Sequence, residues 1–442
     1  MHDDRRQGDY KANSLSLSGT VAMGTGVMIG AGIFALTGQM AELAGNLFPL
    51  AFIIGAIVTL FSAYSYIKMS NAWPSAGGIG MILQKCYGAG GIAAGAAVLM
   101  ALSMVIAESL VARTFATYVL RFFDISGGIL VPILAVGVII FAFIVNIAGN
   151  RSVGMISIVM AAFKIAGIAL FGFAALWASG FDFAIVKQPT QTSAFGFVAS
   201  VAFGILAFKG FTTITNSGAE VEDPHKNVGR AIFISIMICV AAYLLVAFGV
   251  NASLPIDRII EAKDYALAEA AEPALGQVGF ILTILLAVIA TVSGVIASIF
   301  AVSRMLAMLT DMKMIPHSHF GMSGTIQRHT LVYTVVTASF LAMFFDLSRI
   351  ASLGAFFYLV MDMAVHWGVF RYRRKEIGAS SIILLCALTF DAVVLAAFTL
   401  VKLEMDPTIV VIAWVAIAAV FVFERFYLGK WLADPGQHEH HA

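Results

Sequence analysis

Long apolar stretches alternate with short polar segments along most of the chain. About 20 predominantly apolar residues are enough for a helix to cross the hydrocarbon core of a bilayer. By this criterion the pattern predicts twelve membrane-spanning helices. They are expected at residues 15–42, 47–68, 81–112, 128–147, 153–178, 194–218, 229–251, 278–306, 329–345, 349–370, 380–401 and 408–428. An even number of crossings places both ends of the chain on one side of the membrane.

The composition agrees with this pattern and excludes several classes of protein. Of the 442 residues, 60% are hydrophobic and only 12% are charged, which is typical of an integral membrane protein in a lipid bilayer. The net charge of +1 comes without a basic stripe, so no nucleic-acid partner is expected. The three cysteines have no paired spacing, which predicts neither a disulfide framework nor a metal site. No ordered nucleophile, base and acid stand out, so the sequence predicts neither an enzyme nor a bound cofactor.

The connecting segments predict the orientation. Most of their lysines and arginines fall on the side of the N-terminus, and such an excess marks the cytoplasmic side. We therefore expect a multi-pass protein of the cell membrane with a cytoplasmic N-terminal tail, residues 1–14, and a cytoplasmic C-terminal tail, residues 429–442. The polar N-terminal tail carries no signal-peptide pattern.

Several ionisable residues fall inside the predicted helices. A charged side chain at the centre of a bilayer costs at least about 2.5–3.5 kcal/mol on insertion scales, so such residues are candidates for function. They are Lys164, Lys209, Glu108, Asp362, His366 and Asp391. His366 follows Asp362 by four residues on the same helical face and is expected to make a structural hydrogen bond rather than relay a proton. For Asp391 we expect a packing or dimer contact.

Two of the predicted helices carry interruptions. The first contains "GVMIGAGIFALTG", residues 26–38, where Gly26, Gly30 and Gly32 each weaken a helix by about 1 kcal/mol relative to alanine. The sixth contains "AFKGFTTITNSG", residues 207–218. Tight packing of small residues would explain either stretch alone. Their matching places in two halves of the chain favour a transporter built from inverted repeats, with its binding site at the midplane.

Five segments, in this order, resemble the amino acid-polyamine-organocation superfamily, and within it the bacterial amino acid permeases. They are "IGAGIF" at 29–34, "NAWPSAGGIG" at 71–80, "GAEVEDPHKNVGRAI" at 218–232, "AKDYALAEAAEPALG" at 262–276 and "AVSRMLAMLTDMKMIP" at 301–316. The last four predicted helices are similar to the family only in length and number.

The resemblance implies an all-α fold with about twelve transmembrane helices. Residues 15–178 and 194–370 would be two inverted five-helix repeats with discontinuous helices 1 and 6, and residues 380–428 would add two peripheral helices. It also implies a secondary active transporter for amino acids that works by alternating access. The identity of the amino acid, and whether the protein forms a homodimer, stay open.

The family's substrate site would lie at the two interruptions. The N–H groups of Gly30, Ala31 and Gly32 at a helix N-terminus suit a carboxylate. Carbonyls near Met28, Ile29, Ala207 and Phe208 suit an ammonium group, and Lys209, Gly210 and Thr212 complete the expected site. Lys209 departs from the family, where this position is small or aliphatic. It either reaches the substrate cavity or pairs with an acid such as Glu108 or Asp362.

Lys164 stands where, in some permeases that resemble this chain, a lysine replaces the sodium ion between the first and eighth helices. We expect its amine near the carbonyls of Gly26 and Ile29 and near the hydroxyl of Ser298 or Ser293. Burial disfavours the charged form of an amine, so a proton is the expected coupling ion. Alternatives are an exchanger in which the lysine never titrates, a sodium-coupled symporter of the same fold, and a channel.

The gate and the closing contacts also follow from the resemblance. Many relatives carry an aromatic gate where this chain has Leu206, which leaves Phe208, Phe211 and Tyr358 as further gating candidates. The acidic residues after the sixth helix, Glu220 among them, are expected to pair with a lysine or arginine in an inner gate.

Overall fold

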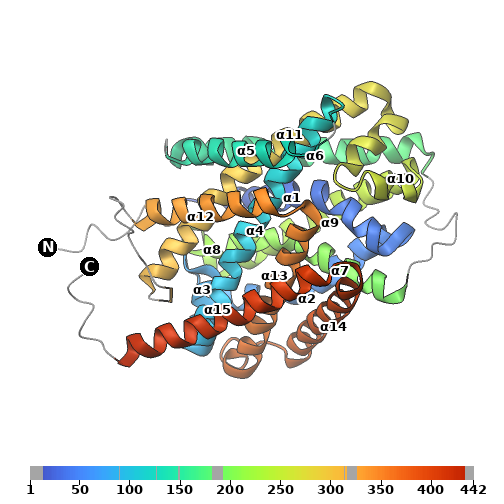
Figure 1. The fold of residues 1–442 in the computed structure, drawn as a ribbon. Coiled ribbons are helices and arrows are strands. Elements are labelled where there is room, and N and C mark those ends of the chain that lie inside the picture. Colours follow the sequence, from blue (N-terminus) through green and yellow to red (C-terminus); the bar gives the residue numbers. More distant parts are fainter. Residues whose placement is uncertain are drawn as a thin grey trace.

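The computed structural model describes residues 13–88, 90–125, 127–147, 150–181, 193–312, 314–315 and 326–433, and these form a bundle of helices (Figure 1). The helices are α1 (Leu17–Ala44), α2 (Phe48–Ala72), α3 (Gly78–Tyr87), α4 (Gly91–Phe122), α5 (Leu130–Ile147), α6 (Asn150–Ala178), α7 (Ala194–Phe208), α8 (Thr212–Asn216), α9 (Pro224–Ser253), α10 (Ile256–Glu261), α11 (Ala266–Asp311), α12 (Ile326–Phe344), α13 (Leu347–Gly368), α14 (Ser381–Met405) and α15 (Pro407–Ala433). Within these ranges no strand forms, apart from a single bridge between Leu15 and Val221.

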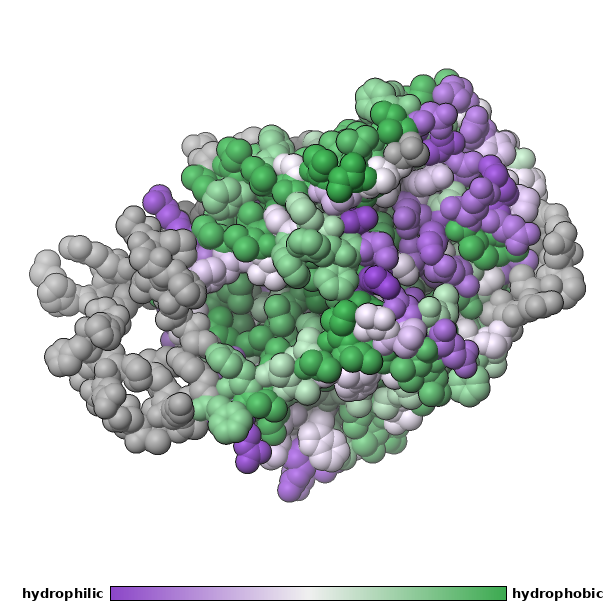
Figure 2. All heavy atoms as spheres, in the orientation of Figure 1, coloured by the Kyte–Doolittle hydropathy of each residue, from purple (hydrophilic) through white to green (hydrophobic). Residues whose placement is uncertain are grey.

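Each predicted span overlaps a helix; the third overlaps α3 and α4, and the sixth overlaps α7 and α8. Among the described residues, nine segments are long and apolar enough to cross a membrane. On the face drawn in Figure 2, hydrophobic residues cover the sides of the bundle and hydrophilic residues gather at the end near α10. Isoleucines along α5, such as Ile133, Ile140 and Ile144, are exposed as lipid-facing residues are expected to be. The chain is an all-α, multi-pass membrane protein.

The third predicted span, 81–112, begins too early. In the structure residues 78–87 form the separate helix α3, and the membrane-spanning helix α4 starts only at Gly91. Gly88 ends α3 with a φ of 72°, a left-handed conformation that glycine adopts without strain. The apolar run therefore continues across a turn that hydropathy alone does not reveal. The eighth span is likewise longer than predicted, because α11 extends across a kink at Gly276.

Both predicted interruptions are present. In α1, Ile29 has non-helical dihedral angles (φ −79°, ψ 75°), which divide the helix into two segments. Helix α7 ends at Phe208, and residues 209–211 form a 3-10 turn before α8. Helix α1 packs against α6, α7, α9 and α11, so the two interruptions lie in the middle of the bundle.

At the surface, the first turn of α13 is tied to the connection between α14 and α15. Arg349 Nε donates a hydrogen bond to Asp406 Oδ2 at 2.6 Å. This hydrogen bond lowers the pKa of Asp406 below its ordinary value. A carboxyl group whose pKa is lowered by folding stabilises the fold at pH values above its unfolded pKa, and this contribution disappears as the pH falls through the folded pKa.

We expect Asp406→Asn to lower the free energy of unfolding at neutral pH by about 0.5–1 kcal/mol, as is usual for a partly exposed pair. The difference from the parent should shrink in acid and vanish once the pH falls through the lowered pKa. Thermal unfolding in detergent across a pH series measures this. Asp311→Asn is the control, because Asp311 is also an exposed acid. A difference independent of pH would contradict the ion-pair explanation.

Candidate functional site

The two interruptions are in direct main-chain contact. A Cβ atom added to Gly210 would lie 2.8 Å from Met28 N, and one added to Gly32 would lie 2.8 Å from Ala207 O. Both separations are shorter than real Cβ contacts, so only glycine allows the backbones to approach this closely. The sequence therefore places glycine on each side of the contact, and the site is built from backbone.

Tyr243 on α9 joins the two interruptions. Its hydroxyl donates to Met28 O at 2.6 Å and reaches Ala207 O at 3.3 Å, and its ring packs on Phe208. These are two of the carbonyls that the sequence assigned to a substrate ammonium group. Sequence reasoning missed Tyr243, because an isolated tyrosine in an apolar helix shows no pattern. Its one signal was a phenolic hydroxyl at membrane depth, which needs a polar partner.

The hydroxyl groups that follow the second interruption serve its own backbone. Thr212 Oγ1 donates to Lys209 O at 2.9 Å, and Thr213 Oγ1 donates to Gly210 O at 2.7 Å. Such bonds to preceding carbonyls are common for threonine in helices. They supply partners for the carbonyls of the 3-10 turn. A contact between Thr212 and substrate stays a prediction.

Lys209 is buried and is anchored to α4. Its amine donates to Ser103 O at 2.7 Å and to Ser103 Oγ at 2.8 Å, and it lies 5.8 Å from the centre of the Tyr358 ring. Among the described residues it forms no ion pair with Glu108 or Asp362. The Glu108 carboxylate is buried without a hydrogen-bond partner. The expected pairing with an acid is therefore replaced by a pairing with main-chain and hydroxyl oxygens.

Lys164 reaches from α6 into the space between α1 and α11. Its amine is buried and donates to Gly26 O at 3.2 Å, which confirms the expected contact with that carbonyl. A Cβ atom on Gly30 would lie 4.0 Å from the amine and 3.7 Å from Ala290 O of α11. The amine therefore lies beside the interruption of α1, on the side that faces α11.

The other expected partners of Lys164 are not found. In the described part of the chain, no hydrogen bond joins its amine to Ile29, Ser293 or Ser298. Ser293 Oγ instead donates to Ala290 O at 3.1 Å, within its own helix. A serine in a helix satisfies its hydroxyl locally when a free carbonyl lies one turn back, and the sequence does not reveal this competition.

Most of the expected site residues at the two interruptions are buried. The expected site residues Met28, Ile29, Ala207 and Phe208 are buried, as are the gating candidates Leu206, Phe211 and Tyr358. Leu206 packs near Gly354 of α13, and the Phe211 ring meets the edge of Tyr66. The backbone of Ala31 belongs to α1, while its side chain lies outside the described part of the structure.

Polar contacts hold both ends of α1. Near its start, Ser14 N and Leu15 N donate to Glu220 O at 2.9 Å, and Arg304 of α11 pairs with Glu220 at 3.3 Å. The expected pairing of Glu220 with a basic residue is thus confirmed. Near the other end, Lys263 pairs with Glu42 at 2.6 Å. These contacts link α1 to segments that lie far away in the sequence.

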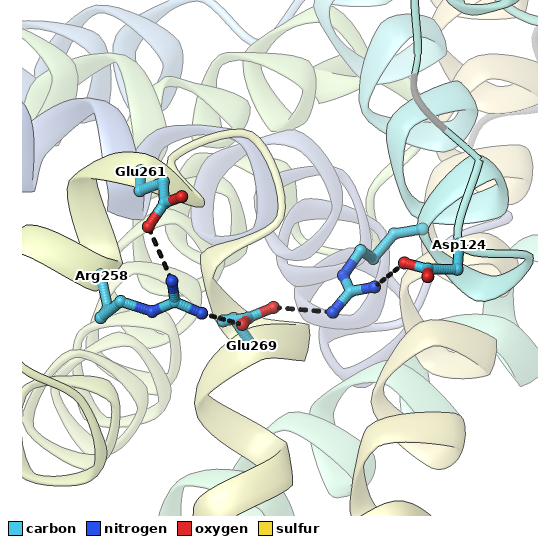
Figure 3. Close-up of polar contacts among 5 residues, drawn as sticks. Asp124, Arg258, Glu261 and Glu269 are labelled. Carbon is cyan, nitrogen blue, oxygen red and sulfur yellow. Dashed lines mark hydrogen bonds and ion pairs between the residues drawn. The ribbon is translucent and has the colours of Figure 1, made fainter.

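A cavity of about 630 Å³ opens beyond the C-terminal end of α1. Figure 3 shows one part of its lining, in which Glu269 lies between two guanidinium groups. Glu269 pairs with Arg258 and with Arg121, each at 3.2 Å. Asp264 also lines the cavity, and burial raises the pKa of its carboxyl group. The cavity is thus lined by charges of both signs.

Comparisons with known proteins match most of the chain. The family model described as amino acid permease matches residues 15–427. An uncharacterized protein of Methanocaldococcus jannaschii is 32% identical over 364 residues, which cover 81% of this chain and 82% of that protein. The inner membrane transport protein YbaT of Escherichia coli is 28% identical over 397 residues, which cover 89% of this chain and 91% of that protein. The branched-chain amino acid permease BcaP of Lactococcus lactis is 25% identical over 390 residues, which cover 80% of this chain and 81% of that protein.

We expect Gly210→Ala to destabilise the protein by about 1–3 kcal/mol, because the added methyl group overlaps the backbone of Met28. Thermal unfolding in detergent measures the effect. Gly137→Ala is the control, since Gly137 lies on α5 with open space around it and alanine favours a helix. Equal shifts in both variants would contradict the close contact between the interruptions.

Proposed function

Because the chain belongs to the amino acid permease family, we propose that it is a secondary active transporter that carries amino acids across the cell membrane by alternating access. The observation that carries this proposal is the main-chain contact between two interrupted helices among buried residues. Irregular backbone at membrane depth is tolerated only where protein or a cavity surrounds it, and in transporters it marks the substrate site.

The substrate would bind with both of its charged ends on main chain. Its carboxylate would accept hydrogen bonds from the N–H groups of Gly30, Ala31 and Gly32, where the second segment of α1 begins after Ile29. Its ammonium group would donate to the carbonyls of Met28 and Ala207. Tyr243 now contacts both carbonyls, so substrate binding requires its hydroxyl to shift.

Lys164 would couple transport to protons. When charged, its amine holds Gly26 of α1 from the side of α6. When neutral, it is a weaker partner for that carbonyl, and the first segment of α1 is freer to move. The geometry supports this role because the amine is buried and, among the described residues, donates its hydrogen bond to a backbone oxygen of the interrupted helix. No sodium ion needs to share this space.

The proposed architecture follows the family. Residues 15–178 and 194–370 would be the two inverted repeats, and α14 and α15 would be peripheral. The excess of basic residues on the side of the N-terminus supports cytoplasmic tails. The contacts of Glu220 would then form the inner gate and the pair of Lys263 with Glu42 the outer one. Transport requires each of these gates to open in turn.

The direct test is uptake of radiolabelled amino acids into proteoliposomes with an imposed pH gradient, with and without sodium. We expect the parent to accumulate substrate when protons flow inward, irrespective of sodium. Lys164→Ala should lose the dependence on the gradient. The matched control is Lys402→Ala, which removes another buried lysine from the peripheral helix α14.

Other results would identify the alternatives. Uptake that needs internal substrate and ignores pH in both proteins would indicate an exchanger in which Lys164 never titrates. Accumulation driven by sodium would indicate a symporter that uses this cation. Conductance without saturation would indicate a channel. Each of these results would contradict proton coupling.

We further propose that Lys209 disfavours cationic substrates. Lys209 belongs to the 3-10 turn whose Gly210 contacts Met28, and its buried amine lies against Ser103 of α4, so a second positive charge at the interruptions would be repelled. Lys209→Met should therefore increase competition by lysine and arginine relative to neutral amino acids. Lys402→Met, outside the interrupted helices, should leave the ranking of competitors unchanged. An unaltered ranking in Lys209→Met would contradict this role.

A further inference from the structure

A cluster of three ionisable side chains lies between α13 and α14, and no member is exposed. Asp362 and His366 come from successive turns of α13, and Asp391 comes from α14. His366 Nε2 lies 3.4 Å from Asp362 Oδ2 and 3.3 Å from Asp391 Oδ2. The cluster takes no part in the transport steps above, although three residues of α2 support it.

The residues of α2 orient two members of the cluster. Ser62 and Tyr66 donate hydrogen bonds to the Asp362 carboxylate. Ser65 Oγ lies 2.8 Å from His366 Nδ1 and accepts its proton in the tautomer that leaves Nε2 unprotonated. A hydrogen bond at the outer ring nitrogen is the usual support of a metal-ligating histidine. Nε2 is therefore free to act as a ligand.

The inner atoms of the cluster have no hydrogen-bond partner outside it. Among the described residues, His366 Nε2 and both oxygens of Asp391 are buried without a hydrogen bond. No lysine or arginine of the described chain pairs with Asp362 or Asp391. Two carboxylates without compensating positive charge are unfavourable in a low-dielectric interior. A cation therefore belongs among these atoms.

The distances favour a metal ion over a proton. Hydrogen bonds between a protonated histidine and a carboxylate are about 2.7–2.9 Å long, and a single N–H shared between two oxygens makes only weak hydrogen bonds to each. Ligands bound to zinc at about 2.0–2.1 Å with tetrahedral angles are about 3.3–3.4 Å apart. The two separations from His366 Nε2 match this edge length.

We propose that Asp362, His366 and Asp391 bind one zinc ion, which fastens the peripheral helix α14 to α13. Two carboxylates and a neutral imidazole give a site of zero net charge with a divalent cation, as burial in the membrane requires. The second oxygen of Asp391 offers a further ligand, since it too has no partner. The site is structural, because it is closed to water and none of its three ligands belongs to an interrupted helix.

The test is the zinc content of the purified full-length protein, measured by inductively coupled plasma mass spectrometry after incubation with zinc and dialysis. The chain is produced with a tag that contains no histidine. The variants are Asp391→Asn and His366→Gln at the site, and Glu404→Gln as a matched acid-to-amide control on the same helix, where it is exposed. A fourth variant replaces the histidines of the C-terminal tail, His438, His440 and His441, by alanine.

We expect one zinc ion per chain in the parent, in Glu404→Gln and in the tail variant, and its loss in both site variants. A parent without zinc, or a content that falls only in the tail variant, would overturn the proposal. If the site variants do not fold, the visible absorption spectrum of the parent protein loaded with cobalt decides. Intense visible absorption of tetrahedral cobalt supports the site, whereas weak octahedral bands or no bands overturn it.

Discussion

Backbone polar groups within a bilayer must find their partners inside the protein, and the centre of this structure is organised by that constraint. Two helices are interrupted where they meet, and glycines bring their backbones into contact. The carbonyls at the interruptions then receive hydrogen bonds from Tyr243, Thr212 and Thr213. A site made in this way can exchange an internal donor for the ammonium group of a substrate without exposing an unpaired group to lipid.

The buried lysines follow the same logic. Among the described residues, neither Lys164 nor Lys209 contacts a carboxylate. Lys164 donates to the main-chain oxygen of Gly26, and Lys209 donates to that of Ser103. A backbone carbonyl stabilises a cation less firmly than a carboxylate does, so the charge on such an amine remains adjustable. The third buried cluster, around His366, differs, since two carboxylates surround one ring nitrogen there. Acidic side chains therefore gather beside α14, and basic side chains gather beside the interruptions.

Hydropathy, glycine content and the polar run that begins at Lys209 were sufficient to predict the membrane-spanning helices and both interruptions, because these are local properties. The start of the third span was wrong, since the turn at Gly88 lies within an apolar run. The contacts of Tyr243 and Ser103 were not predictable, because each depends on which helices become neighbours. The link between Lys164 and Gly26 was predicted only through resemblance to a family. Lys164 does not bond to Ser293, because the Ser293 hydroxyl donates to Ala290 O within its own helix, and a sequence does not reveal this local hydrogen bond.

The central claim is that an amine held by main-chain oxygen carries a proton through the transport cycle. The most direct measurement is the number of protons that enter proteoliposomes with each substrate molecule, followed with a trapped pH-sensitive dye during uptake by the parent protein. The account predicts a fixed ratio of one proton per amino acid, which persists when sodium is absent. Saturable amino acid uptake without any change in internal pH would contradict it.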